Sequence, residues 1–347
     1  MKTKNMFHIS SLSFSFLLFI ILSILLLYTF YQKYNVIEKM TMKDSILQKY
    51  GKKEGITFYP NEKKIKICNS HSCIIKTYPR GHFNSISSHQ LAKNKPKTSD
   101  LLKLHHIPTP NYVIIHRNNS YKIKPENYPV VLKPLDGMQG KDVYTDIENE
   151  KQFEKIKSEL LQKYPQIMLE NQIIGENYRI FIFENKVMDV VERVKPIVIG
   201  DGIHSIQKLI ELRNEKQKKD GNYPTKYIHE NTILKQGYQL DSIPPKNKKI
   251  VITNTINYHN GANPKRIPLE KIPKKNIYLF IKAHQTLGLI CSGIDYMSPN
   301  ICIPYDKNKG TIIEVNDMVD TKIHVYADNK SNPGFLYENI IKQLKNK

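Results

Sequence analysis

A long apolar run near the N-terminus, residues 9–31, constrains the fold more than any other feature, because it contains no charged residue. A helix of this length covers roughly 30 Å, about the thickness of the hydrocarbon core of a bilayer. A cleavable signal peptide has a shorter apolar region of about 7–15 residues, followed by a small-residue cleavage site. This run continues instead into bulky residues. The pattern therefore predicts an uncleaved, single-pass transmembrane anchor.

Lysines on either side of this run predict its orientation. Two of them precede the run, and a denser group follows it: Lys2 and Lys4, then Lys33, Lys39, Lys43, Lys49, Lys52 and Lys53. Basic residues concentrate on the cytoplasmic side of membrane spans, so we expect the large C-terminal part to lie in the cytosol. The sequence thus predicts a single-pass membrane protein, with residues 1–8 as a tail and the membrane as a partner.

The four cysteines fit a reducing compartment, because they are too few to form a disulfide framework in a chain of 347 residues. Cys68, His71 and Cys73 stand close together, and a three-ligand metal cluster is one interpretation of this grouping. The spacing matches no zinc pattern and offers no fourth ligand. Ordinary thiols on a pair of strands are the favoured interpretation.

A net charge of +21 raises the question of nucleic-acid binding. Only six of the 53 basic residues are arginine, the residue preferred for bidentate contacts to phosphates and bases. The lysines are scattered along the chain and do not form one stripe. We therefore expect no nucleic-acid partner. A basic surface still favours ATP, anionic lipid or an acidic substrate.

Beyond the apolar run, helical and strand patterns alternate without strict strand–helix–strand units, which is typical of the α+β class. Helices are expected within residues 95–107, 148–165, 204–219 and 276–289. Strands are expected within residues 55–60, 64–69, 73–79, 130–134, 166–173, 177–194 (a hairpin turning at 184–186), 291–297, 300–306 and 311–317.

The same patterns predict the domain organisation. Residues 32–86 are expected to form a charged stalk and a small β-containing module. A main domain is expected over residues 87–330, and a C-terminal helix or tail over residues 331–347. No internal repeat interrupts this order.

The stretch "VVLKPLDGMQGKDV", residues 130–143, combines a buried strand, a lysine at its end and a loop with two glycines. A turn needs the glycines but not the lysine. A nucleotide phosphate uses both, because glycines let backbone N–H groups approach an anion and the lysine supplies a charge. The stretch is not a P-loop, since Leu135 and Asp142 stand where that motif needs glycine and a hydroxyl. Phosphate binding and a plain hairpin both remain open on this stretch alone.

A second group of polar residues lies near the C-terminus. Glu314 and Asn316 are two apart on an expected strand, so their side chains project from the same face. Asp295 lies on a preceding strand, from which it can reach that face. Two carboxylates and an amide oxygen suit a hard cation such as Mg²⁺, which shares its coordination shell with substrate phosphates. The alternative is that these residues simply face solvent on an antiparallel sheet.

Taken together, the motifs resemble a known family. Seven motifs occur in its order between residues 87 and 324: "LKPLDGMQGKDV", "IMLENQIIGENYRIFIF", "GDGIHSIQKLIELRN", "ILKQGYQLDSIPP", "NYHNGANP", "GLICSGIDY" and "GTIIEVND". The chain resembles the ATP-grasp superfamily, and within it the domain found in cyanophycin synthetases and bifunctional glutathione-synthesis ligases. The resemblance implies two α+β lobes that hold ATP between them. It also implies ligation of a small carboxylate to an amine through an acyl-phosphate, with ATP and Mg²⁺, or Mn²⁺ in its place.

The resemblance also implies a nucleotide site. Lys95 and Lys133 match the lysines that hold the phosphates, and Gly137 and Gly140 frame the loop that closes over them. The hinge that meets the adenine matches residues 170–173, from Glu170, which takes the amino group, to Ile173. The ribose position, usually acidic, is occupied by Asn177, with Glu176 beside it as a substitute.

The remaining roles implied by the resemblance concern the metal and the substrate. Asp295, Glu314 and Asn316 match the Mg²⁺ ligands. Arg179 and Arg193 match arginines that face the transferred phosphoryl group or the substrate carboxylate. Asn257 falls in the loop of the "N-x-x-x-G-(G/A)" motif.

The chain departs from the family's pattern on the substrate side. The Pro-Gly that commonly follows the last motif is replaced by residues 317–320, and "NYHNGANPKRIP" lacks the usual aspartate. The second half of cyanophycin synthetases is absent, which argues against polymer synthesis. A non-catalytic nucleotide-binding or scaffold protein derived from a ligase is the alternative function.

Overall fold

The computed structural model describes residues 45–69, 73–77, 83–118, 121–137, 141–254, 256–329 and 333–345. All of them belong to one compact unit, Lys39–Lys347, and a second unit, Met1–Glu38, lies outside the described residues.

The predicted membrane localisation is corrected by this structure. None of the helices in the described ranges is long and apolar enough to cross a membrane. The longest of them, α5 (Glu150–Lys163) and α6 (Ile206–Lys219), have 14 residues each, whereas a span needs about 20 apolar residues. The run predicted as the anchor, residues 9–31, lies outside the described residues.

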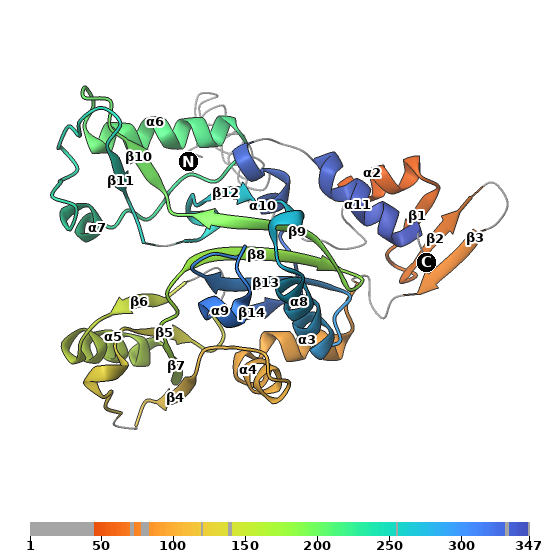
Figure 1. The fold of residues 1–347 in the computed structure, drawn as a ribbon, viewed down its shortest axis with the longest axis horizontal. Coiled ribbons are helices and arrows are strands. Elements are labelled where there is room, and N and C mark those ends of the chain that lie inside the picture. The colour runs from red at the N-terminus through yellow and green to blue at the C-terminus, as the bar shows by residue number, and fades with distance from the viewer. Residues whose placement is uncertain are drawn as a thin grey trace, which may run out of the picture. The chain divides into compact units, whose positions relative to one another are not determined.

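A five-stranded antiparallel sheet forms the centre of the described unit (Figure 1). Its order is β12 (Asn263–Arg266), β9 (Lys186–Val194), β8 (Glu176–Phe183), β13 (Cys291–Ser298) and β14 (Thr311–Asn316). The predicted hairpin is confirmed: β8 and β9 turn through Glu184 and Asn185, both with positive φ, as a tight two-residue turn requires.

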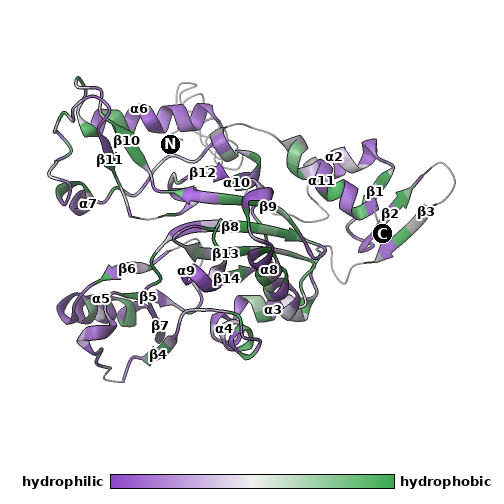
Figure 2. Cartoon of the chain, in the orientation of Figure 1, coloured by the Kyte–Doolittle hydropathy of each residue, from purple (hydrophilic) through white to green (hydrophobic). Residues whose placement is uncertain are grey.

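The two faces of this sheet have different surroundings. On one face, alternate residues such as Tyr178, Ile180 and Ile182 pack with α8 (Lys274–Thr286) in a continuous apolar core. The opposite face is divided: Phe181 and Phe183 are covered near α11 (Pro333–Lys345), whereas the other end carries charged side chains. In Figure 2 the strands are mostly coloured as hydrophobic where they pass through these cores, whereas α6 is coloured mostly as hydrophilic. The charged end of the divided face positions the candidate site.

The second sheet of the described unit has four antiparallel strands. Its order is β4 (Tyr112–His116), β7 (Gln166–Asn171), β5 (Val130–Pro134) and β6 (Tyr144–Ile147). The predicted amphipathic helix, α5, buries Phe153 and Leu160 against it. Helices α3 (Ile86–Lys93) and α4 (Lys95–Leu104) precede this sheet in the chain and contact each other.

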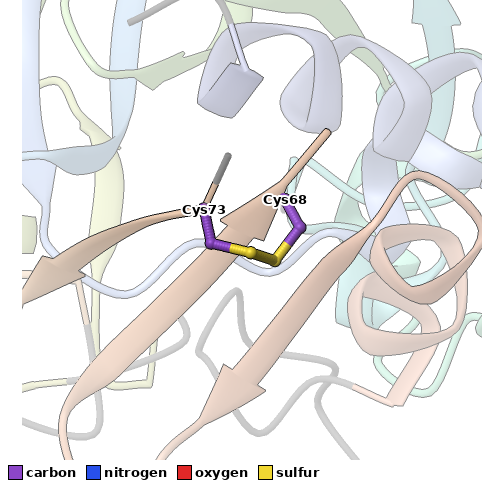
Figure 3. The surroundings of a disulfide bond; sticks show 2 residues. All are labelled: Cys68 and Cys73. Carbon is purple, nitrogen blue, oxygen red and sulfur yellow. A yellow bond between two sulfur atoms is a disulfide. The ribbon is translucent and has the colours of Figure 1, made fainter. Parts of the chain in front are cut away.

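The N-terminal part of the described chain forms a small sheet of β1 (Ile56–Tyr59), β2 (Lys64–Cys68) and β3 (Cys73–Thr77). Helix α2 (Ser45–Lys53), expected as part of a stalk, packs in one core with this sheet and α11. Cys68 and Cys73 face each other in the register of β2 and β3 and form a disulfide (Figure 3). The interpretation of these residues as free thiols is therefore wrong.

A further small lobe contains β10 (Ile197–Ile199), β11 (Lys249–Val251), α6 and α7 (Glu230–Leu234) around their own apolar core. The predicted strand at residues 300–306 is wrong, because a turn there leads into α9 (Tyr305–Asn308). Pro304 is the N-cap of this helix, and the Asn276 side-chain oxygen accepts a hydrogen bond from Tyr305 N–H. The other short helices are α10 (Lys322–Val325), η1 (Pro125–Asn127), η2 (Tyr258–Asn260), η3 (Leu269–Lys271) and η4 (Ala327–Asn329).

Candidate active site

Strand register collects several predicted site residues on one face of the five-stranded sheet. Asp295 on β13 lies opposite Arg179 on β8 and opposite Glu314 on β14. On the next strand pair, Asn177 of β8 lies opposite Arg193 of β9. Because side chains alternate along a strand and opposed residues share a face, these five side chains project from the same side.

Asp295 is the centre of an ion-pair cluster on this face. Its Oδ1 accepts a hydrogen bond from Arg179 Nη1 at 2.8 Å and lies 2.9 Å from Arg193 Nη2. Arg193 Nη1 also donates to Asn177 Oδ1 at 2.9 Å. Burial alone would raise the pKa of the Asp295 carboxyl, but the charges and hydrogen bonds of Arg193 and Arg179 hold it below its ordinary value. Asp295 is therefore ionised and keeps two guanidinium groups together.

Lys95 connects this face with the predicted phosphate loop. Asn94 caps α4 by accepting Lys97 N–H at 3.1 Å, so the helix begins at Lys95. The Lys95 ammonium donates to the carbonyl of Leu135 at 3.3 Å and to that of Gly137 at 3.0 Å. It also lies 3.4 Å from Glu314 Oε1. One lysine thus joins the loop after β5 to a carboxylate on β14.

Lys133 and Glu170 form a second buried pair, within the four-stranded sheet. Lys133 of β5 lies opposite Met168 of β7, and Glu170 lies two residues further along β7 on the same face. The Lys133 ammonium is 2.7 Å from Glu170 Oε2, and both side chains are 9% exposed. The predicted phosphate lysine and the predicted adenine residue therefore contact each other directly.

Other predicted residues are placed by their own segments. Asn257 is the N-cap of η2 and accepts the His259 N–H at 2.9 Å. Ile173 is half-buried between β7 and β8. Glu176 is exposed and, being adjacent to Asn177 on β8, points to the opposite face. Only Asn177 of this pair shares a face with Arg179, and Gly140 lies outside the described residues.

Two residues that sequence reasoning missed hold the ends of the strands around this site. The Asn84 side-chain amide donates to the carbonyls of Cys291 and Asp317 at 2.7 and 2.6 Å. Its oxygen accepts from Ile290 and Cys291 N–H. His89 Nδ1 lies 2.5 Å from Asp317 Oδ2, directly after Asn316. These partners are more than 200 residues apart, and no local pattern could have revealed them.

The chemistry of the donor set fits a hard cation. Asp295, Glu314 and Asn316 offer carboxylate and amide oxygens on neighbouring strands, the ligand types that Mg²⁺ takes alongside phosphate oxygens. They do not form a closed protein cage, and the described ranges contain no group of three or more His, Cys, Asp or Glu residues that could hold a metal alone. In this structure Asp295 and Glu314 are paired with arginine and lysine.

Comparisons with known proteins show what this chain is similar to. Residues 92–196 match the family model of the ATP-grasp domain. Cyanophycin synthetase of Trichormus variabilis is 29% identical over 246 residues, covering 68% of this chain and 27% of that protein. The glutathione biosynthesis bifunctional protein GshAB of Streptococcus agalactiae is 28% identical over 249 residues, covering 67% of this chain and 33% of that protein.

Among solved structures, a bifunctional glutathione synthetase from Pasteurella multocida superposes with a TM-score of 0.54 at 20% sequence identity. The match covers 82% of this chain and 41% of that one. The family-model match and the two relatives confirm the resemblance to the ATP-grasp superfamily, and the solved structure confirms the α+β fold. The chain spans about a third or less of the length of the curated relatives named here.

Proposed function

We propose that this chain is an ATP- and Mg²⁺-dependent ligase that joins a small carboxylate to an amine. The observation that carries the proposal is the cluster of Arg179, Arg193 and Asp295 on an ATP-grasp sheet, with Glu314 on the next strand. Phosphoryl transfer needs positioned charges more than an activated nucleophile, and this face offers cations and carboxylates side by side. The relatives named above are a cyanophycin synthetase and proteins of glutathione synthesis, which supports the proposal.

The reaction takes place in two steps. A carboxylate oxygen of the substrate attacks the γ-phosphorus of ATP, the bond to the β–γ bridging oxygen breaks, and ADP leaves. The amine nitrogen then attacks the carbonyl carbon of the acyl-phosphate. The C–O bond to phosphate breaks, inorganic phosphate leaves, and the nitrogen loses a proton. An amide results, without any oxidation or reduction.

The proposed nucleotide contacts follow the described geometry. Lys133 and Lys95 would hold phosphates, the latter by exchanging its carbonyl contacts at Leu135 and Gly137. Glu170 and the Ile173 backbone would meet the adenine. Contacts to the ribose would come from the segment with Glu176 and Asn177, and Gly140 would complete the phosphate loop with Gly137.

The proposed metal and substrate contacts lie on the sheet face. Asp295, Glu314 and Asn316 would bind Mg²⁺, which neutralises phosphate charge when it arrives with ATP. Arg179 and Arg193 would stabilise the transferred phosphoryl group or the substrate carboxylate. Asn257, at the start of η2, would border the substrate. We also propose residues 87–330 as the ATP-grasp domain.

The test is ADP release by the full chain with Mg·ATP and pairs of candidate carboxylates and amines. Hydroxylamine in place of the amine should trap the acyl-phosphate as a hydroxamate, which reveals the carboxylate before the amine is known. Glu314→Gln should abolish both signals, while Glu338→Gln, a matched change at an exposed position of α11, should leave them intact.

A non-catalytic nucleotide-binding protein is the second candidate. It is favoured by one observation: the carboxylates proposed for the metal are already neutralised by protein cations. Such a protein would bind Mg·ATP but release ADP at the same negligible rate with and without substrates. Equal, substrate-independent rates in the unmodified chain and in Glu314→Gln would select this alternative.

A further inference from the structure

Gly293 lies on β13 beneath the guanidinium group of Arg179. Its register partners are Phe181 on β8 and Asn316 on β14, so it occupies the same face as the Arg179–Asp295 pair. A Cβ added at Gly293 would lie 2.5 Å from Arg179 Cζ and Nη2 and 2.6 Å from Nε. These distances are all far below van der Waals contact, so the guanidinium plane occupies the space that any side chain at 293 would need.

The backbone at this position does not itself require glycine. The φ of Gly293 lies outside the left-handed region, in which glycine is favoured over other residues. Glycine inside a strand usually weakens it, because it packs nothing and loses more entropy on folding. The Arg179 side chain that lies over position 293 therefore explains why glycine is present there, and the backbone conformation does not.

We infer that Gly293 is a positioning residue that sets the position of the Arg179 guanidinium for its partner Asp295 and for the substrates of the proposed function. The Arg179 side chain is only 7% exposed. Its guanidinium group lies over Gly293, and its Nη1 donates a hydrogen bond to Asp295 Oδ1. A methyl group at 293 would lift the guanidinium off the strand. Because the guanidinium is the end of a flexible side chain, the fold would tolerate this shift while the geometry of the cluster would not.

A double-mutant cycle with Gly293→Ala and Arg179→Ala tests this role. In the unmodified chain, Gly293→Ala should lower the melting temperature by a few degrees, since Arg179 is displaced from Asp295. In the Arg179→Ala background the methyl group meets no guanidinium, so the same change should be neutral or raise the melting temperature. Leu160→Ala, in the separate core of α5 and the four-stranded sheet, serves as control and should cost the same in both backgrounds.

The second readout rests on the proposed ligase function. Gly293→Ala should lower kcat roughly tenfold or more, the size expected when a charged hydrogen bond is misplaced, while KM for ATP stays unchanged. In the Arg179→Ala background it should cause no further loss. Equal costs of Gly293→Ala in both backgrounds would overturn the positioning role. Absence of any ligase activity would remove the proposed function but leave the stability cycle as a complete test.

Discussion

The ammonium of Lys133 and the carboxylate of Glu170 lie 2.7 Å apart inside the four-stranded sheet. Both side chains are almost fully buried, so each charge depends on the other to offset its desolvation. A nucleotide whose phosphate bound Lys133 and whose adenine bound Glu170, as we propose, would compete with this pair for the same two charged groups. The pair is therefore both a structural element and a competitor of the proposed ligand.

Replacing Lys133 should separate these two roles. Lys133→Met should lower Mg·ATP affinity by about 1.5–3 kcal/mol, the contribution of a hydrogen bond to a charged group. It should also destabilise the fold by about 3–5 kcal/mol, because Glu170 is left as an uncompensated buried charge. Isothermal titration calorimetry and urea unfolding measure the two effects.

The matched control is the double variant Lys133→Met/Glu170→Gln. Removing the second charge should restore most of the stability but not the affinity for Mg·ATP, because the proposed phosphate contact of Lys133 and the proposed adenine contact of Glu170 are then both absent. If affinity returned together with stability, Lys133 would act only through the fold, and its proposed phosphate contact would be wrong.

Neutralising Asp295 should destabilise the fold more than neutralising Glu314. The Asp295 side chain is 17% exposed and holds two arginines, whereas Glu314 is 31% exposed and holds one lysine at 3.4 Å. Asp295→Asn should therefore lower the free energy of unfolding by about 3 kcal/mol or more. Glu314→Gln should lower it by less than about 1 kcal/mol. Urea unfolding checks this order, and an equal cost of the two changes would contradict the described cluster.

Local patterns were enough to predict most elements of the fold. The apolar period over residues 148–165 predicted α5, and alternation over residues 177–194 predicted the β8–β9 hairpin with its turn. The strand predicted at residues 300–306 failed, because Pro304 and the Asn276 cap favour a helix start, and the cap comes from a distant residue.

The contacts of the candidate site could be predicted less well than its members. Spacing placed Glu314 and Asn316 on one face. Only the register of β8, β13 and β14 brings Arg179 opposite Asp295, to which it donates a hydrogen bond. The Cys68–Cys73 disulfide was missed because a cysteine count says nothing of strand register. Long-range pairing is set by the whole chain, which no local window contains.

His284 should make the fold sensitive to acid. This histidine is fully buried on α8, where Nδ1 lies 2.7 Å from the Ser292 hydroxyl, and burial lowers its pKa to about 4. Its unfolded pKa is about 6.5, so protons bind the unfolded chain more tightly. The free energy of unfolding should thus fall as the pH drops from about 6.5 to about 4, by about 3 kcal/mol from this residue.

Urea unfolding at several pH values measures this dependence. His284→Gln should flatten the curve in that window, apart from the slope contributed by buried His324, whose pKa is also lowered by burial. Ser292→Ala keeps the buried imidazole and should keep the slope. An identical slope in His284→Gln and in the unmodified chain would show that this histidine does not carry the acid sensitivity.

The disulfide between Cys68 and Cys73 should stabilise the small three-stranded sheet without affecting nucleotide binding. It closes a loop with a sequence separation of 5, for which loss of unfolded-chain entropy accounts for about 2 kcal/mol. Dithiothreitol should therefore lower the melting temperature, and the variant Cys68→Ser/Cys73→Ser should match the reduced chain and ignore the reductant. Cys302→Ser, at an exposed free cysteine, is the matched control and should keep the full response.

Calorimetric titration with Mg·ATP should give the same affinity before and after reduction, because Lys95, Lys133 and Glu170 make their described contacts outside this sheet. A loss of affinity on reduction would instead couple the sheet to the nucleotide site.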